Sequence, residues 1–338
     1  MEAKNILLGH GSGGTLTHQL IQDIFVKHFS NSILNVQGDS ALLDISSWEI
    51  AMTTDSFVVD PIFFPGGDIG KLAIAGTVND LAVAGAIPQY LSAAFIIEEG
   101  LPLSDLERVV KSMAAEAEKA GVRIVTGDTK VVERGKCDKL FINTTGVGIL
   151  DEEHEKICTG CKVTPGDQIL INGAIGNHGM AIMAARNELK LSAEILSDCA
   201  SLNHLIAKLL NAGIRIKFMR DATRGGLSTV LHELTSGRDF GLEIYEKDLK
   251  VDREVEGMCE LLGFDPMYVA NEGKVVLVVH KDDAGKALEL MQSDPLGKDA
   301  SIIGSIVAEH PGKGYIHTAV GGKRILDMLS GEQLPRIC

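Results

Sequence analysis

The sequence has few aromatic residues and no long apolar run. Phe, Trp and Tyr together make up 4% of the 338 residues, and there is 1 Trp. No apolar stretch approaches the length of roughly 18 residues that crosses a membrane, and the N-terminus lacks the basic segment, apolar stretch and cleavage site of a secretory signal. We therefore expect a cytoplasmic protein that has no membrane as a partner.

Basic residues and cysteines are also scarce. Lys and Arg number 32 against 46 Asp and Glu, which gives a formal net charge of -14 at pH 7. This balance opposes nonspecific binding to nucleic acid and leaves carboxylates free for divalent cations. The 6 cysteines are scattered along the chain and do not form a disulfide framework, as is typical of a reducing compartment. No nucleic-acid partner is expected.

The composition supports two folded domains. An apolar fraction of 45% and 37 glycines are compatible with a globular protein, and 338 residues suffice for two cores. A charged stretch from Asp151 to Lys156 is typical of a passage between domains. We expect one domain at 1–155, a second at 156–330, and a mobile tail at 331–338.

A glycine-rich segment, Gly9 to Gly14, lies between a predicted strand at Asn5 to Leu8 and a predicted helix that begins near Thr15. It contains the pattern G-x-G-x-x-G, which a Rossmann dinucleotide site also has. The segments that follow, at 35–44 and 49–59, are typical of short strands without a crossover helix. This weakens the dinucleotide interpretation, while an anion that faces the glycine turn remains compatible with the sequence.

Four aspartates recur beside glycine, hydroxyl or amide residues. They are Asp39 in Gly38-Asp39-Ser40, Asp55 in Thr54-Asp55-Ser56, Asp80 in Asn79-Asp80, and Asp128 in a glycine turn predicted after a strand at 123–126. The first two could simply hold turns through their own backbone. Four carboxylates that converge would repel one another unless divalent cations neutralise them, and Mg²⁺ carrying nucleotide phosphates is the economical explanation.

Asn79 and Asp80 stand inside a predicted small-residue helix over 69–84. Asn and Asp are poor residues for a helix interior, and their burial among Ala and Gly is costly unless something binds them. Gly76 lies about one turn before Asp80 on the same face, so a ligand could approach the backbone beside the carboxylate. The alternative is a solvated polar stripe, for which the apolar neighbours leave little room.

Two motifs in the second half indicate an anion site and a base. Arg224, Gly225 and Gly226 precede a predicted helix, which is typical of a phosphate site. Glu272 stands in a turn next to apolar strands, where its pKa could rise towards neutrality as a general base requires. The alternative is a turn carboxylate paired with Lys274.

Two further groups have no catalytic assignment. Cys158 and Cys161 form a C-x-x-C that could be half a zinc site, with His154, or a redox pair, but no second C-x-x-C follows. His178 opens a predicted helix and is more typical of a capping or hydrogen-bonded histidine than of a general base.

The chain ends in Pro335-Arg336-Ile337-Cys338. Gly331 and Pro335 oppose a helix that runs to the end, so we expect a mobile arm. Its thiol starts near the reference pKa of about 8.5, and the adjacent α-carboxylate disfavours the thiolate further. Taken alone, Cys338 could be an incidental terminal cysteine.

Together these motifs resemble the ATP-binding superfamily that includes aminoimidazole ribonucleotide synthetase, thiamine-monophosphate kinase and selenophosphate synthetase. The matching segments are Gly38-Asp39-Ser40-Ala41, Thr54-Asp55, Val78-Asn79-Asp80-Leu81, Gly127-Asp128-Thr129, Pro165-Gly166-Asp167 and Thr223-Arg224-Gly225-Gly226. Within this superfamily, four segments are similar to the HypE family of NiFe-hydrogenase maturation proteins. They are His10-Gly11-Ser12-Gly13-Gly14, Phe64-Pro65-Gly66-Gly67-Asp68, Asn271-Glu272-Gly273-Lys274 and the terminal Pro335-Arg336-Ile337-Cys338.

This resemblance, which covers essentially the full length, implies an α+β fold of two α/β domains, with N-terminal sheets that pair into a barrel across a homodimer. It implies an enzyme whose own Cys338 receives a carbamoyl group from the carbamoyltransferase HypF. The group is then dehydrated at the expense of ATP to a thiocyanate, and the cyanide passes to iron held by the HypC-HypD complex.

The resemblance also implies roles for individual residues, with ATP and Mg²⁺ as cofactors. Cys338 would carry the group and Glu272 would act as the base. The expected Mg²⁺ ligands are Asp39, Asp55, Asp80 and Asp128, and the expected contacts to ATP or phosphate are Asn79, Thr129, Lys130, Arg224 and Gly225. Two alternatives remain open: a kinase of a free small molecule, and a nucleotide-gated scaffold that binds maturation partners without chemistry.

Overall fold

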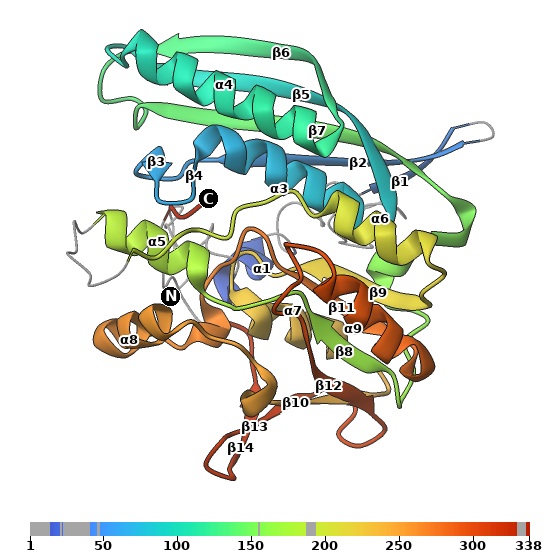
Figure 1. The fold of residues 1–338 in the computed structure, drawn as a ribbon. Coiled ribbons are helices and arrows are strands. Elements are labelled where there is room, and N and C mark those ends of the chain that lie inside the picture. Colours follow the sequence, from blue (N-terminus) through green and yellow to red (C-terminus); the bar gives the residue numbers. More distant parts are fainter. Residues whose placement is uncertain are drawn as a thin grey trace.

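The computed structural model describes residues 14–20, 22, 41–45, 48–154, 156–186, 194–329 and 336–338. Asp39, the glycine-rich segment before residue 14 and residues 330–335 lie outside the described residues. Two sheets, one above the other in Figure 1, make up much of the described chain. A buried helix, α3 (Ile69–Val83), lies between them.

The first sheet has the strand order β1-β2-β7-β5-β6. Its strands are β1 (Ala41–Ile45), β2 (Trp48–Phe57), β5 (Ala86–Glu98), β6 (Arg123–Val132) and β7 (Leu140–Leu150). β5 and β6 pair in parallel, and the other neighbours pair antiparallel. Buried and more exposed residues alternate along β7, so one face of the sheet is covered and the other is open.

Two helices, α3 and α4 (Leu103–Ala120), cover one face of this sheet (Figure 1). On the other face, three large apolar side chains form what we call the open-face patch: Met52 at 41% exposure, Ile87 at 62% and Ile149 at 39%. Ile87 and Ile149 are direct cross-strand neighbours. An apolar patch of this kind marks an interaction surface more often than a monomer surface.

The second sheet has the order β14-β13-β10-β12-β8-β11-β9. Its strands are β8 (Gln168–Ile171), β9 (Ile216–Asp221), β10 (Gly241–Tyr245), β11 (Val275–Val279), β12 (Ser301–Val307), β13 (Gly314–His317) and β14 (Lys323–Leu326). The helices of this half are α5 (Asn177–Arg186), α6 (Asn203–Asn211), α7 (Gly226–Thr235), α8 (Arg253–Leu262) and α9 (Ala284–Gln292).

β11 shows why this sheet needs helices on both sides. All its residues are buried. Val276 and Val278 pack in one core with α7, whereas Leu277 packs in another core with α6 and α9. A strand that is apolar at every position is stable only when both faces of its sheet are covered.

Short elements connect these layers. They are α1 (Thr15–Leu20), β3 (Phe63–Phe64), β4 (Gly67–Asp68) and the 3-10 helices η4 (Glu152–His154), η5 (Ile157–Thr159), η6 (Glu246–Asp248), η7 (Pro266–Tyr268) and η8 (Lys281–Asp283). In the described ranges, no helix has both the length and the apolar character to pass through a bilayer.

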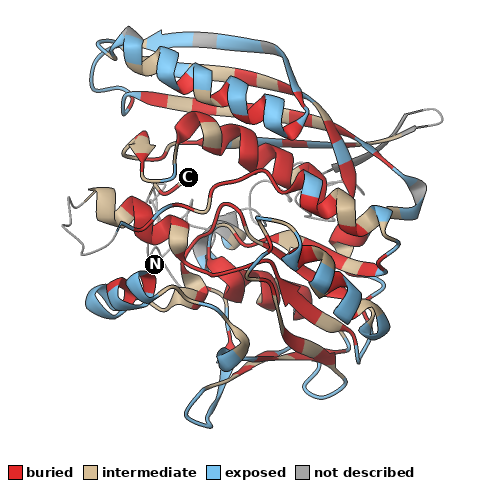
Figure 2. Ribbon diagram, viewed as in Figure 1, coloured by how far each residue is buried: buried red, intermediate tan, exposed pale blue. Residues whose placement is uncertain are grey.

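α3 is buried almost along its whole length, as Figure 2 shows. It contacts β2 and β7 of the first sheet, and also α6 and β9 of the second half. A helix that is apolar all round must lie between two layers. The helix expected over 69–84 is therefore present, and Asp68 caps it by accepting the N–H groups of Gly70 and Lys71.

Candidate active site

Asp55 and Asp80 lie where β2 crosses α3. Thr53 donates its hydroxyl to Asp80 Oδ2 at 2.7 Å, and Asp55 is two residues further along β2, on the same face. Gly76 lies about one helical turn before Asp80, and a Cβ atom at Gly76 would lie 3.6 Å from Asp55 Oδ2. The structure thus places both carboxylates over the small-residue face of the helix.

These two carboxylates fit a Mg²⁺ ion that arrives with phosphates. Mg²⁺ in proteins usually keeps several waters and takes one or two carboxylates together with substrate phosphates. Within the residues that the structure describes, no group of three or more His, Cys, Asp or Glu side chains could hold a metal ion. The available ligands therefore suit an ion carried by a nucleotide better than an ion enclosed by protein alone.

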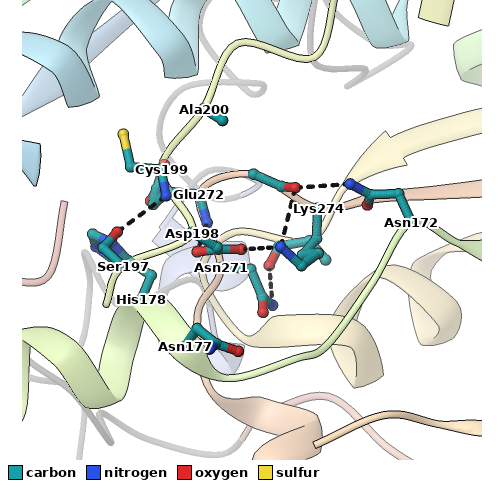
Figure 3. Close-up of polar contacts among 12 residues, drawn as sticks. Asn172, Asn177, His178, Ser197, Asp198, Cys199, Ala200, Asn271, Glu272 and Lys274 are labelled. Atoms are coloured by element: carbon teal, nitrogen blue, oxygen red, sulfur yellow. Dashed lines mark hydrogen bonds and ion pairs between the residues drawn. The ribbon is translucent and has the colours of Figure 1, made fainter. Parts of the chain in front are cut away.

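Glu272 lies in the loop before β11 and is 3% exposed. Its backbone N–H donates to Asp198 Oδ1 at 3.0 Å, and its carbonyl accepts the N–H of Ala200 at 3.3 Å. Lys274 pairs with Asp198 at 2.9 Å, as Figure 3 shows. The alternative interpretation, in which Lys274 pairs with Glu272, is therefore wrong.

The surroundings of Glu272 favour its protonated form. Burial raises the pKa of Glu272 well above its usual value, and the neighbouring Asp221, Asp55 and Asp198 raise it further, while Arg224 opposes the shift. A carboxyl with a raised pKa can accept a proton near neutral pH and hold it, as a general base must. The direction of this shift agrees with the sequence-based expectation.

The first position of α7 needs glycine. Gly226 has φ +61°, and a Cβ atom there would lie 2.6 Å from the carbonyl oxygen of Met267 and 2.7 Å from that of Val269. No larger residue fits without moving that backbone. The tight turn places the first backbone N–H groups of α7 beside Arg224, an arrangement typical of anion sites.

Arg224 is solvent-exposed, and it also lies next to acidic groups. The neighbouring Cys338 raises the pKa of its guanidinium, and Asp55, Glu272 and Asp80 add to the effect. These five residues come from both halves of the chain and from its end. We call them the central cluster.

The last three residues are docked against the rest of the chain, and the C-terminus lies beside β3 and β4 in Figure 1. The carbonyl of Cys338 accepts the N–H of Val58 at 3.1 Å, and the carbonyl of Arg336 accepts that of Asp60 at 3.3 Å. Ile337 is 5% exposed and packs in the core around α3.

The structure thus describes 336–338 in a docked position, and the mobility expected of the tail at 331–338 stays a prediction. The tail finds backbone donors and an apolar pocket that are not visible in its own sequence. Burial raises the pKa of the Cys338 thiol to about 12, with Glu272 and Asp55 adding to the shift and Arg224 opposing it. The docked thiol is thus far more protonated at neutral pH than a free one with a pKa of about 8.5.

Asp128 and Lys130 lie apart from the central cluster. They pair with each other at 3.8 Å on β6, with side chains 65% and 72% exposed. In the order β2-β7-β5-β6, about three strand spacings, or on the order of 14 Å, separate them from Asp55.

Within the chain, Asp128 therefore does not converge with Asp55 and Asp80, and its role as a Mg²⁺ ligand stays a prediction. The physical reason is that the predicted glycine turn does not form, because β6 continues through Gly127, Asp128 and Thr129 as a strand. Asp39, the remaining expected ligand, lies outside the described residues.

Asn79, an expected ATP contact, makes its hydrogen bonds within the protein. Its Oδ1 accepts the N–H of Leu202 at 2.7 Å, and its Nδ2 donates to the carbonyl of Ala200 at 3.0 Å. The side chain is buried and joins α3 to the segment at 194–202. Its desolvation is offset by these bonds, so the buried amide does not require a ligand.

His178 is a hydrogen-bonded histidine, as expected from the sequence. It is buried, with Nδ1 at 2.8 Å from Ser197 Oγ and Nε2 at 2.6 Å from the carbonyl oxygen of Ile337. The sequence did not reveal Ser197, Asp198 or Arg186 as residues around the site. Ser197 is 19 residues from His178, and Asp198 is 74 residues from the backbone it fixes, so no local pattern links them.

The C-x-x-C motif gives no metal site in the described part of the chain. Cys158 is buried and Cys161 is exposed, and neither forms a disulfide. In the described ranges, neither belongs to a group of three or more metal-binding side chains. The zinc interpretation with His154 therefore gains no support.

Comparison with known proteins identifies the family. Two family models match the chain: "AIR synthase related protein, N-terminal domain" over residues 37–150, and the corresponding C-terminal domain over residues 164–317. The carbamoyl dehydratase HypE of Rhodobacter capsulatus is 49% identical over 338 residues, which cover 99% of this chain and 98% of the relative. HypE of Escherichia coli K12 is also 49% identical, and the match covers 99% of both chains.

Solved structures agree with this assignment. A HypE structure in complex with ATP is 48% identical with a TM-score of 0.82, and the match covers 99% of this chain and 100% of that chain. A HypE-HypF complex gives 50% identity and a TM-score of 0.86, over 92% of this chain and 99% of that chain. A thiamine monophosphate kinase from Aquifex aeolicus, at 16% identity and a TM-score of 0.65 over 91% of this chain and 99% of that chain, shares the fold alone. Because both family models match and the identity to its relatives extends over nearly the full length, the chain belongs to the HypE family of carbamoyl dehydratases.

Proposed function

We propose that this protein uses ATP to dehydrate a carbamoyl group on the sulfur of its own Cys338. The product is a thiocyanate, which supplies the cyanide ligand of the NiFe-hydrogenase iron. The observation that carries the proposal is the central cluster, in which the terminal thiol lies near Arg224, Glu272 and Asp55. An incidental terminal cysteine would have no reason to be held there.

Loading and dehydration need different positions of the tail. The docked thiol is half-buried and has a pKa of about 12, which makes it a poor nucleophile. The tail therefore leaves its docked position to receive the carbamoyl group, and it returns to the central cluster once loaded. HypF is the proposed donor, and the solved complex of a HypE relative with HypF supports this.

The chemistry of dehydration explains the groups around the sulfur. The carbamoyl oxygen is a poor leaving group, so transfer of the γ-phosphoryl group of ATP to that oxygen prepares it to leave as phosphate. One N–H proton is lost in this step. Loss of phosphate together with the second N–H proton then forms the carbon-nitrogen triple bond.

The residues of the central cluster have distinct roles in this sequence. Glu272 accepts an N–H proton, and Arg224 and the N-terminus of α7, after Gly225, hold phosphate. Asp55 and Asp80 would hold Mg²⁺, which offsets the charge of the transferring phosphoryl group when it is bound. The expected contacts of Asp128, Thr129 and Lys130 to ATP or Mg²⁺ require a neighbouring chain, because β6 lies away from the cluster.

The proposed assembly is a homodimer that pairs the open faces of two first sheets, supported by the open-face patch. The proposed domains, 1–155 and 156–330, each contain one of the two sheets. The HypC-HypD complex is the proposed acceptor of the cyanide, and the cytoplasm is the proposed location. ATP binding is supported by the solved ATP complex of a relative.

The test follows the C-terminal peptide by mass spectrometry. The full chain is incubated with HypF, carbamoyl phosphate and ATP, and the peptide should first gain one carbamoyl group and then lose one water. Cys338→Ala should gain nothing. If the carbamoyl oxygen carries a heavy isotope, the label should appear in the released phosphate.

Other outcomes separate the alternatives. A protein that never gains the carbamoyl group, or gains it and never loses water with ATP present, contradicts the proposal. A kinase of a free small molecule would keep its activity in Cys338→Ala. If the protein were a scaffold, it would bind ATP but would not hydrolyse it, even with a carbamoyl group on Cys338.

A further inference from the structure

The tail is held through its backbone carbonyls, through the buried Ile337 side chain, and through the Arg336 guanidinium, which donates to the carbonyl of Val58 at 3.2 Å and pairs with Asp138. Besides the two hydrogen bonds from the segment at 58–60, Arg186 Nη2 donates to the carbonyl of Arg336 at 2.7 Å and to that of Asp60 at 2.7 Å. Arg186 thus joins the tail to the segment at 58–60. Recognition through carbonyls is independent of what the sulfur of the last residue carries.

The carbonyl of Ile337 is reached by a buried histidine. His178 Nε2 lies 2.6 Å from this oxygen, and Nδ1 lies 2.8 Å from Ser197 Oγ. Ser197 Oγ accepts the N–H of Cys199 at 3.1 Å, so its own proton is available for Nδ1. This leaves Nε2 as the protonated nitrogen, which donates to the tail. Burial lowers the pKa of His178, in agreement with a neutral ring.

A glycine-containing loop that the proposed chemistry does not use supports this histidine. Phe64 packs edge-on against the His178 ring, with centroids 5.5 Å apart at 89°. Ser197 donates its N–H to the carbonyl of Pro65 at 2.9 Å. Gly66 has φ +91°, and a Cβ atom there would lie 2.6 Å from the carbonyl oxygen of Ser197, so the loop can approach only as glycine.

We propose that His178 is a positioning residue that docks the tail by donating a hydrogen bond to the Ile337 carbonyl. The same docking site then accepts Cys338 as a free, carbamoylated or cyanated residue. The site recognises the carbonyls and the buried side chain of Ile337, while the sulfur lies near the central cluster. The inference rests on the proposed function for its catalytic consequence, but docking itself can be measured without catalysis.

The experiment compares His178→Leu with His178→Gln in the full chain. Leu keeps the apolar burial but removes the donor, whereas the amide nitrogen of Gln can take the place of Nε2. Alkylation of Cys338 by iodoacetamide, followed on the C-terminal peptide by mass spectrometry, should be about tenfold faster in His178→Leu, as expected when a docking equilibrium loses one buried hydrogen bond. His178→Gln should stay close to the unmodified protein.

The same variants should separate loading from dehydration. In His178→Leu, carbamoyl loading by HypF should be at least as fast as in the unmodified protein, because an undocked tail is accessible. Loss of water from the loaded tail, measured in a single turnover with ATP, should be about tenfold slower, and His178→Gln should restore it. A general loss of folding would lower both rates and the melting temperature together.

A matched control removes another bond between a histidine and a backbone carbonyl. His204 Nε2 lies 2.8 Å from the carbonyl oxygen of Lys119 on an exposed part of α6, and His204→Leu should leave the alkylation rate unchanged. Equal rates for His178→Leu and the unmodified protein, or equal rates for His178→Leu and His178→Gln, would overturn the inference. The alkylation rates could differ as expected while neither the variants nor the unmodified protein loses water from the carbamoylated tail. In that case the docking stands and the proposed function fails.

A variant of the docked tail tests the same contact by changing Ile337 instead of His178. Ile337→Ala removes the buried side chain next to the end of the chain and leaves the carbonyl that His178 contacts. It should also speed alkylation of Cys338 by at least about tenfold, because a buried Ile-to-Ala change costs at least as much as one hydrogen bond. Alkylation at the unmodified rate would show that this docking site does not protect the sulfur.

Discussion

Glu272 is a single carboxyl on which burial and three neighbouring carboxylates act in the same direction. Asp198 fixes its backbone and also raises its pKa, so one residue both places Glu272 and tunes it. Lys274 neutralises Asp198 and is thereby kept from neutralising Glu272. The arrangement keeps a protonatable group beside the sulfur at the end of the chain.

Replacing this group tests its role as a base. Glu272→Gln should still accept the carbamoyl group on Cys338, but loss of water should slow by about 10²- to 10⁴-fold, the usual contribution of a general base. In the unmodified protein, the single-turnover rate should rise with pH through the raised pKa of Glu272, because the ionised form accepts the proton. A normal rate and pH profile in Glu272→Gln would exclude Glu272 as the base.

The same pKa predicts a change in stability. Between the ordinary carboxyl pKa of about 4.3 and the raised pKa of Glu272, the folded chain binds this proton more tightly than the unfolded chain. The free energy of unfolding should therefore contain a contribution that is complete at low pH and is lost as pH rises through that range. Urea titrations at several pH values should show a shallower decline in Glu272→Gln, and parallel curves would contradict the assignment.

The sequence predicts which residues belong to the site from their local motifs, but it does not predict which distant residues contact them. The glycine, hydroxyl and carboxyl patterns around Asp55, Asp80 and Arg224 are local, and the sequence reveals them. Asp198 and Ser197 act through contacts with distant segments and stand in a stretch without a periodic pattern. Their roles depend on the packing of whole elements.

α3 is the element that holds the two halves together. Its apolar surface faces the first sheet on one side and the second half on the other, and Asn79 supplies directional bonds across that contact. Its start was predictable from Asp68 as the N-cap, and its end from Gly85, which has φ +87° just after the helix. The strand predicted at 123–126 is present as the start of β6, but the turn predicted after it is not, because pairing with β5 continues through Gly127 and Asp128.

The role of Asn79 as a structural link can be measured. Asn79→Ala leaves the N–H of Leu202 and the carbonyl of Ala200 without this partner inside the protein, which should cost about 2–4 kcal/mol of unfolding free energy. Urea denaturation measures this change. The control, Gln168→Ala, removes an amide bond to Gly166 at the surface and should cost less than about 0.5 kcal/mol. A weaker affinity for ATP with unchanged stability would restore Asn79 as a nucleotide contact.

In the part of the chain that the structure describes, the seven-stranded sheet is covered on both sides and the five-stranded sheet on one side. The α+β fold of two α/β domains could be predicted through the family resemblance, because its motifs are local sequence patterns that occur in both halves of the chain. The relative placement of the halves could not, because it depends on a helix with no polar face and on single hydrogen bonds between distant segments.

The open-face patch predicts how two copies associate. Ile149→Lys should weaken the proposed homodimer by about 100-fold or more, because a lysine buried in an apolar contact loses its hydration without gaining a partner. Size-exclusion chromatography with light scattering measures the mass. Leu261→Lys, on an exposed position of α8 at 73% exposure, is the control and should change nothing. A monomeric unmodified protein, or a dimer that tolerates Ile149→Lys, would contradict the pairing.

The distribution of the thiols gives the molecule a built-in reporter. All six cysteines lie in the described part of the chain, and four of them, Cys137, Cys158, Cys199 and Cys259, are buried. Burial raises the pKa of Cys199, and that of Cys259 to about 11, so these thiols react slowly. In a Cys161→Ser variant, the thiol of Cys338 would be the cysteine thiol that is not fully buried. A chromogenic thiol reagent would then follow the excursions of the tail in solution, continuously and without a fluorophore.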